Sequence, residues 1–222
     1  MLRELVRPLP GVRQISLLRQ RVAFNDSARF WEENYSKGRT SGSGSYGALA
    51  EGKSAFLNHL VRDRAVRSVV EFGCGDGNQL SLAEYPSYVG LDVSRTAIGL
   101  CQSRFARDTT KSFFLYDGTC FTDRGGIFTA DLALSLDVVY HLVEDQVFET
   151  YLGHLFAAAR RFVVIYSTNT KASGTAPHVR HRYFTPWVEA HCPLWRLTGT
   201  VRGPGAERAS ADFFVYERAH DQ

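Results

Sequence analysis

The chain has 222 residues, of which 44% are hydrophobic and 22% are charged. These proportions are those of an ordinary globular protein, so they exclude a mainly disordered chain, and the length suits one domain with a short extension. The formal net charge of +3 comes without the concentrated basic stripe of a dedicated nucleic-acid binder. We expect no transmembrane helix, because no run of about 18 apolar residues is present, and no signal peptide, because Arg and Gln interrupt the N-terminal apolar residues.

The four cysteines are scattered through the chain and form no CxxC pair: Cys74, Cys101, Cys120 and Cys192. Single cysteines spaced in this way are typical of reduced thiols in a cytoplasmic protein, and they do not suggest a disulfide framework. The spacing does not support a zinc site either, so we expect no metal.

The N-terminal part of the chain is irregular. Residues 1–25 have no clear period and are interpreted as a basic arm or a loose first helix. Ser27–Tyr35 predicts a helix with Asp26 or Ser27 as its N-cap. The Gly- and Ser-rich stretch 36–47 predicts a mobile loop. We therefore divide the chain into an N-terminal arm and lid-like segment, 1–47, and one α/β domain, 48–222.

The rest of the chain alternates strands with helices. Short apolar, β-branched runs predict five buried strands at 68–72, 88–91, 112–116, 131–136 and 161–167. Helices are expected at 48–62, 78–85, 94–106, 144–160 and 185–191. Two final strands, 195–201 and 212–217, flank a turn-rich segment and predict an antiparallel pair at the sheet edge. This order indicates a doubly wound, Rossmann-like, mostly parallel seven-stranded sheet with an antiparallel C-terminal strand pair.

A glycine turn follows the first of these strands, in the sequence EFGCGDGN from Glu71 to Asn78. Open α/β sheets bind ligands at the carboxyl ends of their strands. A dinucleotide-binding turn needs a third glycine where this chain has Asn78. The Glu71 carboxylate would repel a pyrophosphate but attract a ligand carrying an ammonium and a sulfonium. Both features disfavour the rival interpretation, a nicotinamide-dependent dehydrogenase on the same fold.

The segment resembles motif I of class I S-adenosylmethionine-dependent methyltransferases, and the resemblance continues over roughly residues 66–168. It implies a cofactor, S-adenosylmethionine, that leaves as S-adenosylhomocysteine. It implies that Asp92 holds the ribose hydroxyls, that Asp117 meets the adenine, and that Asp137 contacts the methionine part or the substrate. The whole set of implied cofactor-binding residues is Glu71, Gly73, Cys74, Gly75, Gly77, Asp92, Val93, Asp117, Gly118, Asp137 and Tyr46.

Plainer alternatives stand beside these roles. The alternative for Asp92 is a helix cap or surface acid, for Asp117 a turn aspartate before a glycine, and for Asp137 a strand-end cap. Tyr46 either stacks on adenine, gates the acceptor, or belongs to a flexible linker whose aromatic residues pack on the core.

The acceptor side is expected to use histidines and a basic loop. A base is needed only for a protonated acceptor such as a hydroxyl, and the candidates for catalytic residues are His141, His178 and His181. The residues expected to bind the acceptor are Trp31, Tyr140, Arg180 and Arg182. The alternatives are a structural histidine at 141 and a solvated basic loop around residues 178–182.

The wider sequence resembles bacterial methyltransferases of glycan or secondary-metabolite assembly. It has none of the NPPY or DPPY motifs of amino-methylating nucleic-acid enzymes. The resemblance implies methyl transfer, at oxygen, to a small-molecule or glycan acceptor, by a monomer or homodimer with no membrane partner and no nucleic acid. The alternative is a non-catalytic or RNA-associated binding module that uses the arginine-rich arm.

Overall fold

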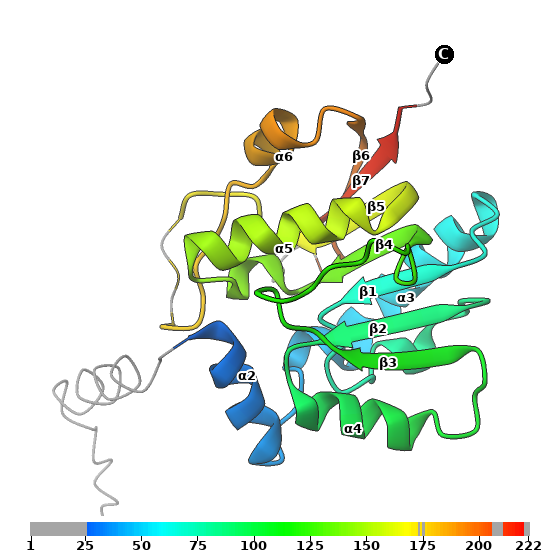
Figure 1. Ribbon diagram of the computed structural model, residues 1–222, viewed down its shortest axis with the longest axis vertical. Helices are drawn as coiled ribbons and strands as arrows, with labels where there is room; N and C mark the ends of the chain where they lie inside the picture. The colour runs from blue at the N-terminus through cyan, green and yellow to red at the C-terminus, as the bar shows by residue number, and fades with distance from the viewer. Residues whose placement is uncertain (1–25, 173, 175, 206–210, 220–222) are drawn as a thin grey trace, which may run out of the picture.

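The structure is a computed structural model that describes residues 26–172, 174, 176–205 and 211–219. The predicted N-terminal arm, 1–25, lies outside these residues. The described chain forms a seven-stranded sheet of order β3-β2-β1-β4-β5-β7-β6 (Figure 1). The strands are β1 Val69–Phe72, β2 Tyr88–Asp92, β3 Lys111–Leu115, β4 Ala130–Leu136, β5 Ala159–Ser167, β6 Trp195–Arg202 and β7 Asp212–Arg218.

The first five strands are parallel, and β7 joins β5 in antiparallel register before pairing with the edge strand β6. This confirms the predicted doubly wound sheet with its antiparallel C-terminal pair. The chain winds outward in both directions from β1, which pairs with β2 on one side and β4 on the other. The strand order therefore reverses at β1, and the crevice that opens at such a point is where ligands bind open α/β sheets.

Helices cover both faces of the sheet (Figure 1). One apolar cluster joins the sheet to α5, Asp145–Ala157, and α6, Thr185–His191. The other joins it to α3, Gly47–Asp63, and α4, Arg95–Arg104. Because β1 and β4 are buried on both faces, their sequences are mostly apolar and do not alternate strictly between apolar and polar residues.

Helix α2, Ser27–Ser36, begins where the sequence predicts, with the Asp26 side chain accepting a hydrogen bond from the Arg29 amide. Ser94 caps α4 in the same way through the Ala97 amide. Three short 3-10 turns complete the described elements: η1 Ser43–Ser45, η2 Leu80–Leu82 and η3 Val139–His141. Among the described residues, no helix is long and apolar enough to cross a membrane, and all four cysteines are free thiols.

The predicted helix over 78–85 is wrong, because only the turn η2 forms there. The Asn58 side chain on α3 explains why the helix does not continue. Its amide donates to the carbonyl of Leu82 at 3.0 Å, and its oxygen accepts from the Glu84 amide at 2.9 Å. These bonds take the backbone groups that a longer helix would have paired internally.

Candidate functional site

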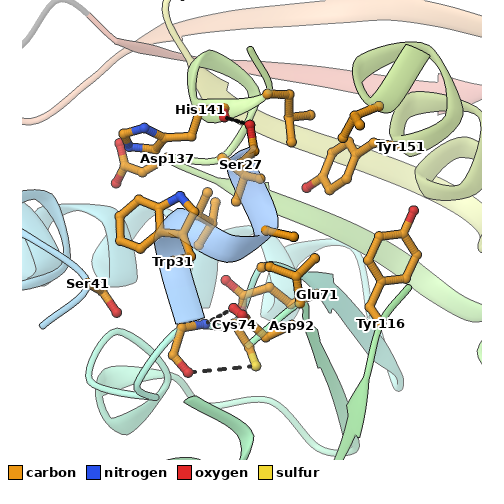
Figure 2. Close-up of a pocket in the computed structure, with 18 of the residues that line it drawn as sticks. Ser27, Trp31, Ser41, Glu71, Cys74, Asp92, Tyr116, Asp137, His141 and Tyr151 are labelled. Carbon is orange, nitrogen blue, oxygen red and sulfur yellow. Dashed lines mark hydrogen bonds between the residues drawn. The ribbon is translucent and has the colours of Figure 1, made fainter. Parts of the chain in front are cut away.

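A pocket opens at the carboxyl ends of β1, β2 and β4, under helix α2. Figure 2 shows Trp31 of α2 on the side of the pocket where His141 and Asp137 lie, away from Tyr116 and Tyr151. The predicted residues that line this pocket are Glu71, Gly73, Cys74, Gly75, Asp92, Val93, Asp137, Trp31 and His141. The fold therefore brings together residues that are up to 110 positions apart in the chain (31 and 141).

The glycine turn after β1 forms the floor of the pocket. Gly73 and Gly75 have φ angles of 83° and 58°, in the left-handed region that favours glycine. A Cβ on Gly75 would lie 2.4 Å from Oγ of Ser41 and 2.9 Å from the hydroxyl of Tyr35. Neither position accepts a side chain, so the backbone itself forms this surface of the pocket.

Asp92 ends β2 beside the glycine turn. Its carboxylate accepts hydrogen bonds from the amides of Gly75, at 2.9 Å, and Ser94, at 2.8 Å. Burial raises the pKa of Asp92 to about 6, against these two amide bonds, which lower it. Each carboxylate oxygen keeps a free lone pair, so Asp92 is able to accept two further hydrogen bonds from a ligand.

Glu71 lies on β1 and is 4% exposed. Its carboxylate accepts a hydrogen bond of 2.6 Å from the hydroxyl of Tyr88. Burial raises the pKa of Glu71 to about 7, while the Tyr88 hydrogen bond and the positive charge of Lys53 lower it. Glu71 and Asp92 thus give the pocket two carboxyls that a cationic ligand would keep ionised.

The Gly- and Ser-rich segment 40–46 is attached to the glycine turn and is not the free loop that the sequence predicts. The carboxylate of Asp76 accepts from the Ser41 amide at 2.9 Å and from the Tyr46 hydroxyl at 2.8 Å. The Asp76 amide in turn donates to Oγ of Ser41. Tyr46 itself does not line the pocket. Its hydroxyl is engaged with Asp76, which holds the segment over the turn.

Asp137 follows β4 and is held from two sides. Its Oδ2 lies 2.5 Å from Nζ of Lys53, which is buried on α3, and its Oδ1 accepts from the Tyr140 hydroxyl at 2.8 Å. Its φ of 60° is rare for a residue other than glycine. Tyr140, predicted to bind the acceptor, lies outside the pocket lining and acts on it through Asp137.

His141 is the one of the three candidate histidines that lines the pocket. Its Nδ1 lies 2.9 Å from the carbonyl oxygen of His178. Because a carbonyl only accepts, Nδ1 carries the hydrogen and Nε2 is left with its lone pair. Burial lowers the pKa of His141 to about 4, so the ring is neutral at physiological pH.

The other two histidines lie beside the pocket. His178 stacks on the ring of Phe30 with centroids 4.2 Å apart, and it also stacks on His141 at 5.5 Å. Nδ1 of His181 lies 2.8 Å from Oγ1 of Thr168. His178 thus supports His141 in the pocket wall, and the predicted catalytic roles of both histidines stay predictions.

The two arginines of the basic loop bind the segment 142–145 of the same chain. Arg182 is buried, and its guanidinium donates to the carbonyls of Leu142 and Val143 and to Asp145. Arg180 donates to the Val143 carbonyl and pairs with Asp145 at 3.0 Å. The donors of Arg182 thus fix the turn that carries His141, and its predicted acceptor-binding role stays a prediction. The predicted acceptor-binding role of Arg180 likewise stays a prediction.

Besides Tyr46, three more of the predicted cofactor residues lie outside the pocket lining. Asp117 is exposed, and its Oδ1 accepts from the amide and the hydroxyl of Thr119, which is the turn geometry that the plainer interpretation predicts. Gly118 lies in the same turn. Gly77 packs instead toward Phe105 and Cys101 on α4. The implied roles of these residues in binding adenine and the cofactor stay predictions.

Helix α2 is attached to opposite rims of the pocket, at its first residue and in its second turn. At one rim, the amide and hydroxyl of Ser27 donate to the carboxylate of Glu144, at 2.9 and 2.6 Å. At the other, Glu32 accepts from the hydroxyls of Ser94 and Thr96, both at 2.6 Å. The helix therefore spans the pocket as a roof.

Sequence reasoning did not predict several of the residues that shape this site. They are Tyr35, Ser41, Lys53, Asp76, Tyr116, Glu144 and Tyr151. The only available signal was the acidic residue inside the glycine turn, Asp76. Among the described residues, no group of three or more His, Cys, Asp or Glu side chains is arranged to hold a metal ion.

No family model matches the chain. One curated relative, a small RNA 2'-O-methyltransferase from Arabidopsis thaliana, is 30% identical over 104 residues, which are 42% of this chain and 11% of the relative. The chain thus spans about a ninth of the length of that relative.

Solved structures of methyltransferases share the fold of the chain. The N-methyltransferase NodS from Bradyrhizobium japonicum, in complex with S-adenosylhomocysteine, superposes with a TM-score of 0.66 and 16% identity, over 88% of this chain and all of that one. Magnesium protoporphyrin IX methyltransferase from Synechocystis gives 0.64 and 17%, over 87% and 100%. The methyltransferase domain of a bacterial Hen1 gives 0.57 and 17%, over 77% and 98%. The chain therefore has the fold of class I S-adenosylmethionine-dependent methyltransferases.

Proposed function

We propose that this protein is an S-adenosylmethionine-dependent methyltransferase that methylates an oxygen of a small-molecule or sugar acceptor. The observation that carries the proposal is the pair of buried carboxyls, Glu71 and Asp92, that line one pocket with the glycine turn. A pocket with two such acids suits a ligand that has hydroxyl and ammonium donors and a sulfonium charge.

The residues fit this cofactor. Asp92 has free lone pairs for the two ribose hydroxyls, and Oε1 of Glu71 is left for a ligand because Tyr88 bonds to Oε2. Gly73 and Gly75 keep the backbone clear of side chains, so that a ligand is able to lie against the turn. The fold's other members, which include structures bound to S-adenosylhomocysteine, support this choice of ligand.

The cofactor, when bound, supplies a methyl group on a sulfonium, which an acceptor lone pair displaces in line. Because that methyl group is already activated, the protein has mainly to align the acceptor and exclude water. Trp31 on the α2 roof and Asp137, which follows β4, border the space left for the acceptor. The roof, attached at both rims, covers part of that space.

His141 is the proposed proton acceptor. The hydroxyl proton of an oxygen acceptor becomes strongly acidic as the new C–O bond forms, so a base with a low pKa is sufficient. The ring is neutral, with Nε2 carrying the lone pair, because the carbonyl of His178 holds the hydrogen on Nδ1. The proton then returns to solvent when the acceptor leaves.

An RNA ribose is the second candidate acceptor. The Arabidopsis relative is named for methylation of a 2'-oxygen of small RNA, and it matches 104 residues of this chain. A ribose hydroxyl and a glycan hydroxyl present the same group to the pocket, so the chemistry above holds for both.

A methyl-transfer screen tests the proposal. Purified protein is incubated with S-adenosylmethionine labelled in the methyl group and with panels of sugars, phenols, amines and short RNAs. Label transferred to a hydroxyl compound supports the proposal, and transfer to RNA alone favours the second candidate. If the protein binds NAD but neither S-adenosylmethionine nor S-adenosylhomocysteine in a thermal-shift assay, the proposal is wrong. The expected stabilisation is about 2.7 kcal/mol for a ligand at 100 times its Kd.

A further inference from the structure

Lys53 is a buried cation behind the wall of the pocket. It lies on α3 with its side chain 1% exposed, and its Nζ is 2.5 Å from Oδ2 of Asp137. The same Nζ lies 5.1 Å from the ring centroid of Tyr166. Its charge also acts on Glu71, on the neighbouring strand β1. The ammonium group of Lys53 therefore has one carboxylate partner and an aromatic ring beside it, and it is shielded from solvent.

Such an ion pair calls for a functional explanation. The free energy lost when two charges are removed from water exceeds their mutual attraction unless the geometry is favourable. Here the backbone of Asp137 also adopts a φ of 60° to bring the carboxylate to the pocket. Backbone strain of this kind is concentrated at functional sites. Gly44 leaves the room for it, since a Cβ there would lie 2.9 Å from Oδ2 of Asp137.

The pair changes what the pocket offers to an acceptor. Asp137 is 14% exposed and lines the pocket, whereas Lys53 lies behind it. The acceptor therefore meets carboxylate oxygens whose charge is already balanced by Lys53 and whose Oδ1 is fixed by the Tyr140 hydroxyl. The wall accepts a hydrogen bond without presenting an uncompensated negative charge.

We propose that Lys53 is a specificity-determining residue that neutralises Asp137, so that the pocket selects a neutral hydroxyl acceptor over a protonated amine. An aliphatic amine is protonated at neutral pH, and its ammonium form has no lone pair with which to attack a methyl group. A carboxylate without a cationic partner would stabilise the unreactive ammonium form. A carboxylate that is already paired with a lysine interacts with the ammonium only weakly. The inference rests on the proposed function and names the acceptor class of the same site.

The test compares two ligands that differ in charge where the methyl group would be. Sinefungin carries an ammonium-bearing carbon in place of the sulfonium, and S-adenosylhomocysteine carries a neutral sulfur there. Their Kd values are measured by calorimetry at about pH 8, where carboxyls of ordinary pKa are ionised. We expect Lys53→Met to raise the preference for sinefungin over S-adenosylhomocysteine roughly tenfold relative to the wild type, because the ammonium becomes the partner of Asp137.

A double-mutant cycle assigns the effect to Asp137. Lys53→Met combined with Asp137→Asn should return the ligand preference to the wild-type value, because no carboxylate is left to compensate. Lys111→Met, which breaks a lysine–aspartate pair with Asp108 on β3, is the matched control and should leave the preference unchanged. Binding of S-adenosylhomocysteine by each variant reports that the pocket has folded.

The outcomes separate the two proposals. If the wild type binds neither ligand, the proposed function fails. If the wild type and Lys53→Met both bind, but with the same ligand preference, the role of Lys53 is overturned while the proposed function stands. A preference that rises in Lys53→Met and persists in the double variant also overturns it, because the charge concerned is then not that of Asp137.

Discussion

Glu71 and Asp92 are acids whose protonation depends on what the pocket holds. Burial raises the pKa of Glu71 to about 7 and that of Asp92 to about 6. In the empty pocket, a fraction of each carboxyl therefore keeps its proton close to neutral pH. A cationic ligand favours the ionised forms, so ligand binding and proton release are coupled at these two residues.

Proton release on binding is the first expected outcome. At about pH 6.5, S-adenosylmethionine should displace protons from Glu71 and Asp92, because the pKa values of about 7 and 6 leave both groups partly protonated in the empty pocket. Calorimetric titrations in buffers of different ionisation enthalpy count the protons released. Glu71→Gln should release fewer protons than the wild type, and an equal count in both proteins would contradict the assignment.

Substitutions in the floor of the pocket give the second prediction. Gly75→Val should abolish binding of S-adenosylmethionine, because its side chain would meet Ser41 and Tyr35 and the φ of 58° is unfavourable for valine. Asp92→Ala should weaken binding by about 1–3 kcal/mol through lost charged hydrogen bonds. Gly99→Ala on α4, where a Cβ would meet no atom within 4 Å, is the matched glycine control. Wild-type affinity in both pocket variants, measured by calorimetry, would disprove the site.

The sequence predicted the polar residues at strand ends better than those that reach the pocket from helices. Glu71, Asp92 and Asp137 follow or end apolar strands, so the topology alone brings them to one edge. Lys53 was not predicted, because a lysine in an amphipathic helix usually belongs to the solvent face. Its partner Asp137 is 84 residues away, and no local pattern records that contact.

At the scale of the element, α2 controls access to the pocket. It carries Trp31 into the lining and is fastened through Ser27 at one end and Glu32 in its second turn. A ligand the size of a nucleoside amino acid has to pass this helix. The strength of the two attachments therefore sets how often the roof opens.

Loosening the roof should speed ligand exchange, which is the third prediction. Glu32→Ala removes the hydrogen bonds to Ser94 and Thr96, and Ser27→Ala removes one to Glu144. Each should raise the dissociation rate of S-adenosylhomocysteine several-fold, as expected for a loss of about 0.5–1.5 kcal/mol. Stopped-flow fluorescence of Trp31 reports the rate. Glu33→Ala, on the exposed face of α2, serves as the control, and if it speeds release as much, the attachments are not responsible.

Helix prediction succeeded where local signals are complete and failed where a distant side chain intervenes. The start of α2 and the cap of α4 were readable from Asp26 and Ser94. The helix predicted over 78–85 failed because Asn58, on another helix, takes the backbone groups of Leu82 and Glu84. The local sequence around 78–85 does not indicate a contact with a residue so far away in the chain.

At the scale of the whole molecule, the alternation of strands and helices determined the sheet. Parallel strands need crossovers, and right-handed crossovers restrict the order to few choices, so the doubly wound form was predictable from the sequence. The insertion of β7 between β5 and the edge strand β6 was only partly predictable from the sequence. The pattern predicted an antiparallel pair but not which member lies inside, since that depends on burial of β7 by both helical layers.

The fourth prediction is that the free energy of unfolding depends on pH through Glu71. Its folded pKa, about 7, lies above the ordinary value of 4.5, so its contribution is fully present below about pH 4.5 and is lost as pH rises through about 7. Glu71→Gln keeps the shape without the charge. The free energy of unfolding of the wild type, measured with urea and no ligand, should therefore fall relative to Glu71→Gln between about pH 5 and pH 8. A constant difference between the two proteins would contradict the assignment.

The partners of α2 lie far along the chain, 114 to 117 residues away for Ser27 and 62 to 64 for Glu32. During synthesis on the ribosome, this helix emerges early but finds its anchorage only after β4 and the start of α5 have been made. Contacts that join such distant segments tend to form late in folding. Segments that are held by such contacts also open locally at a low cost in free energy. The binding pocket is thus completed last in folding, and its roof should be among the first parts to exchange its amide hydrogens.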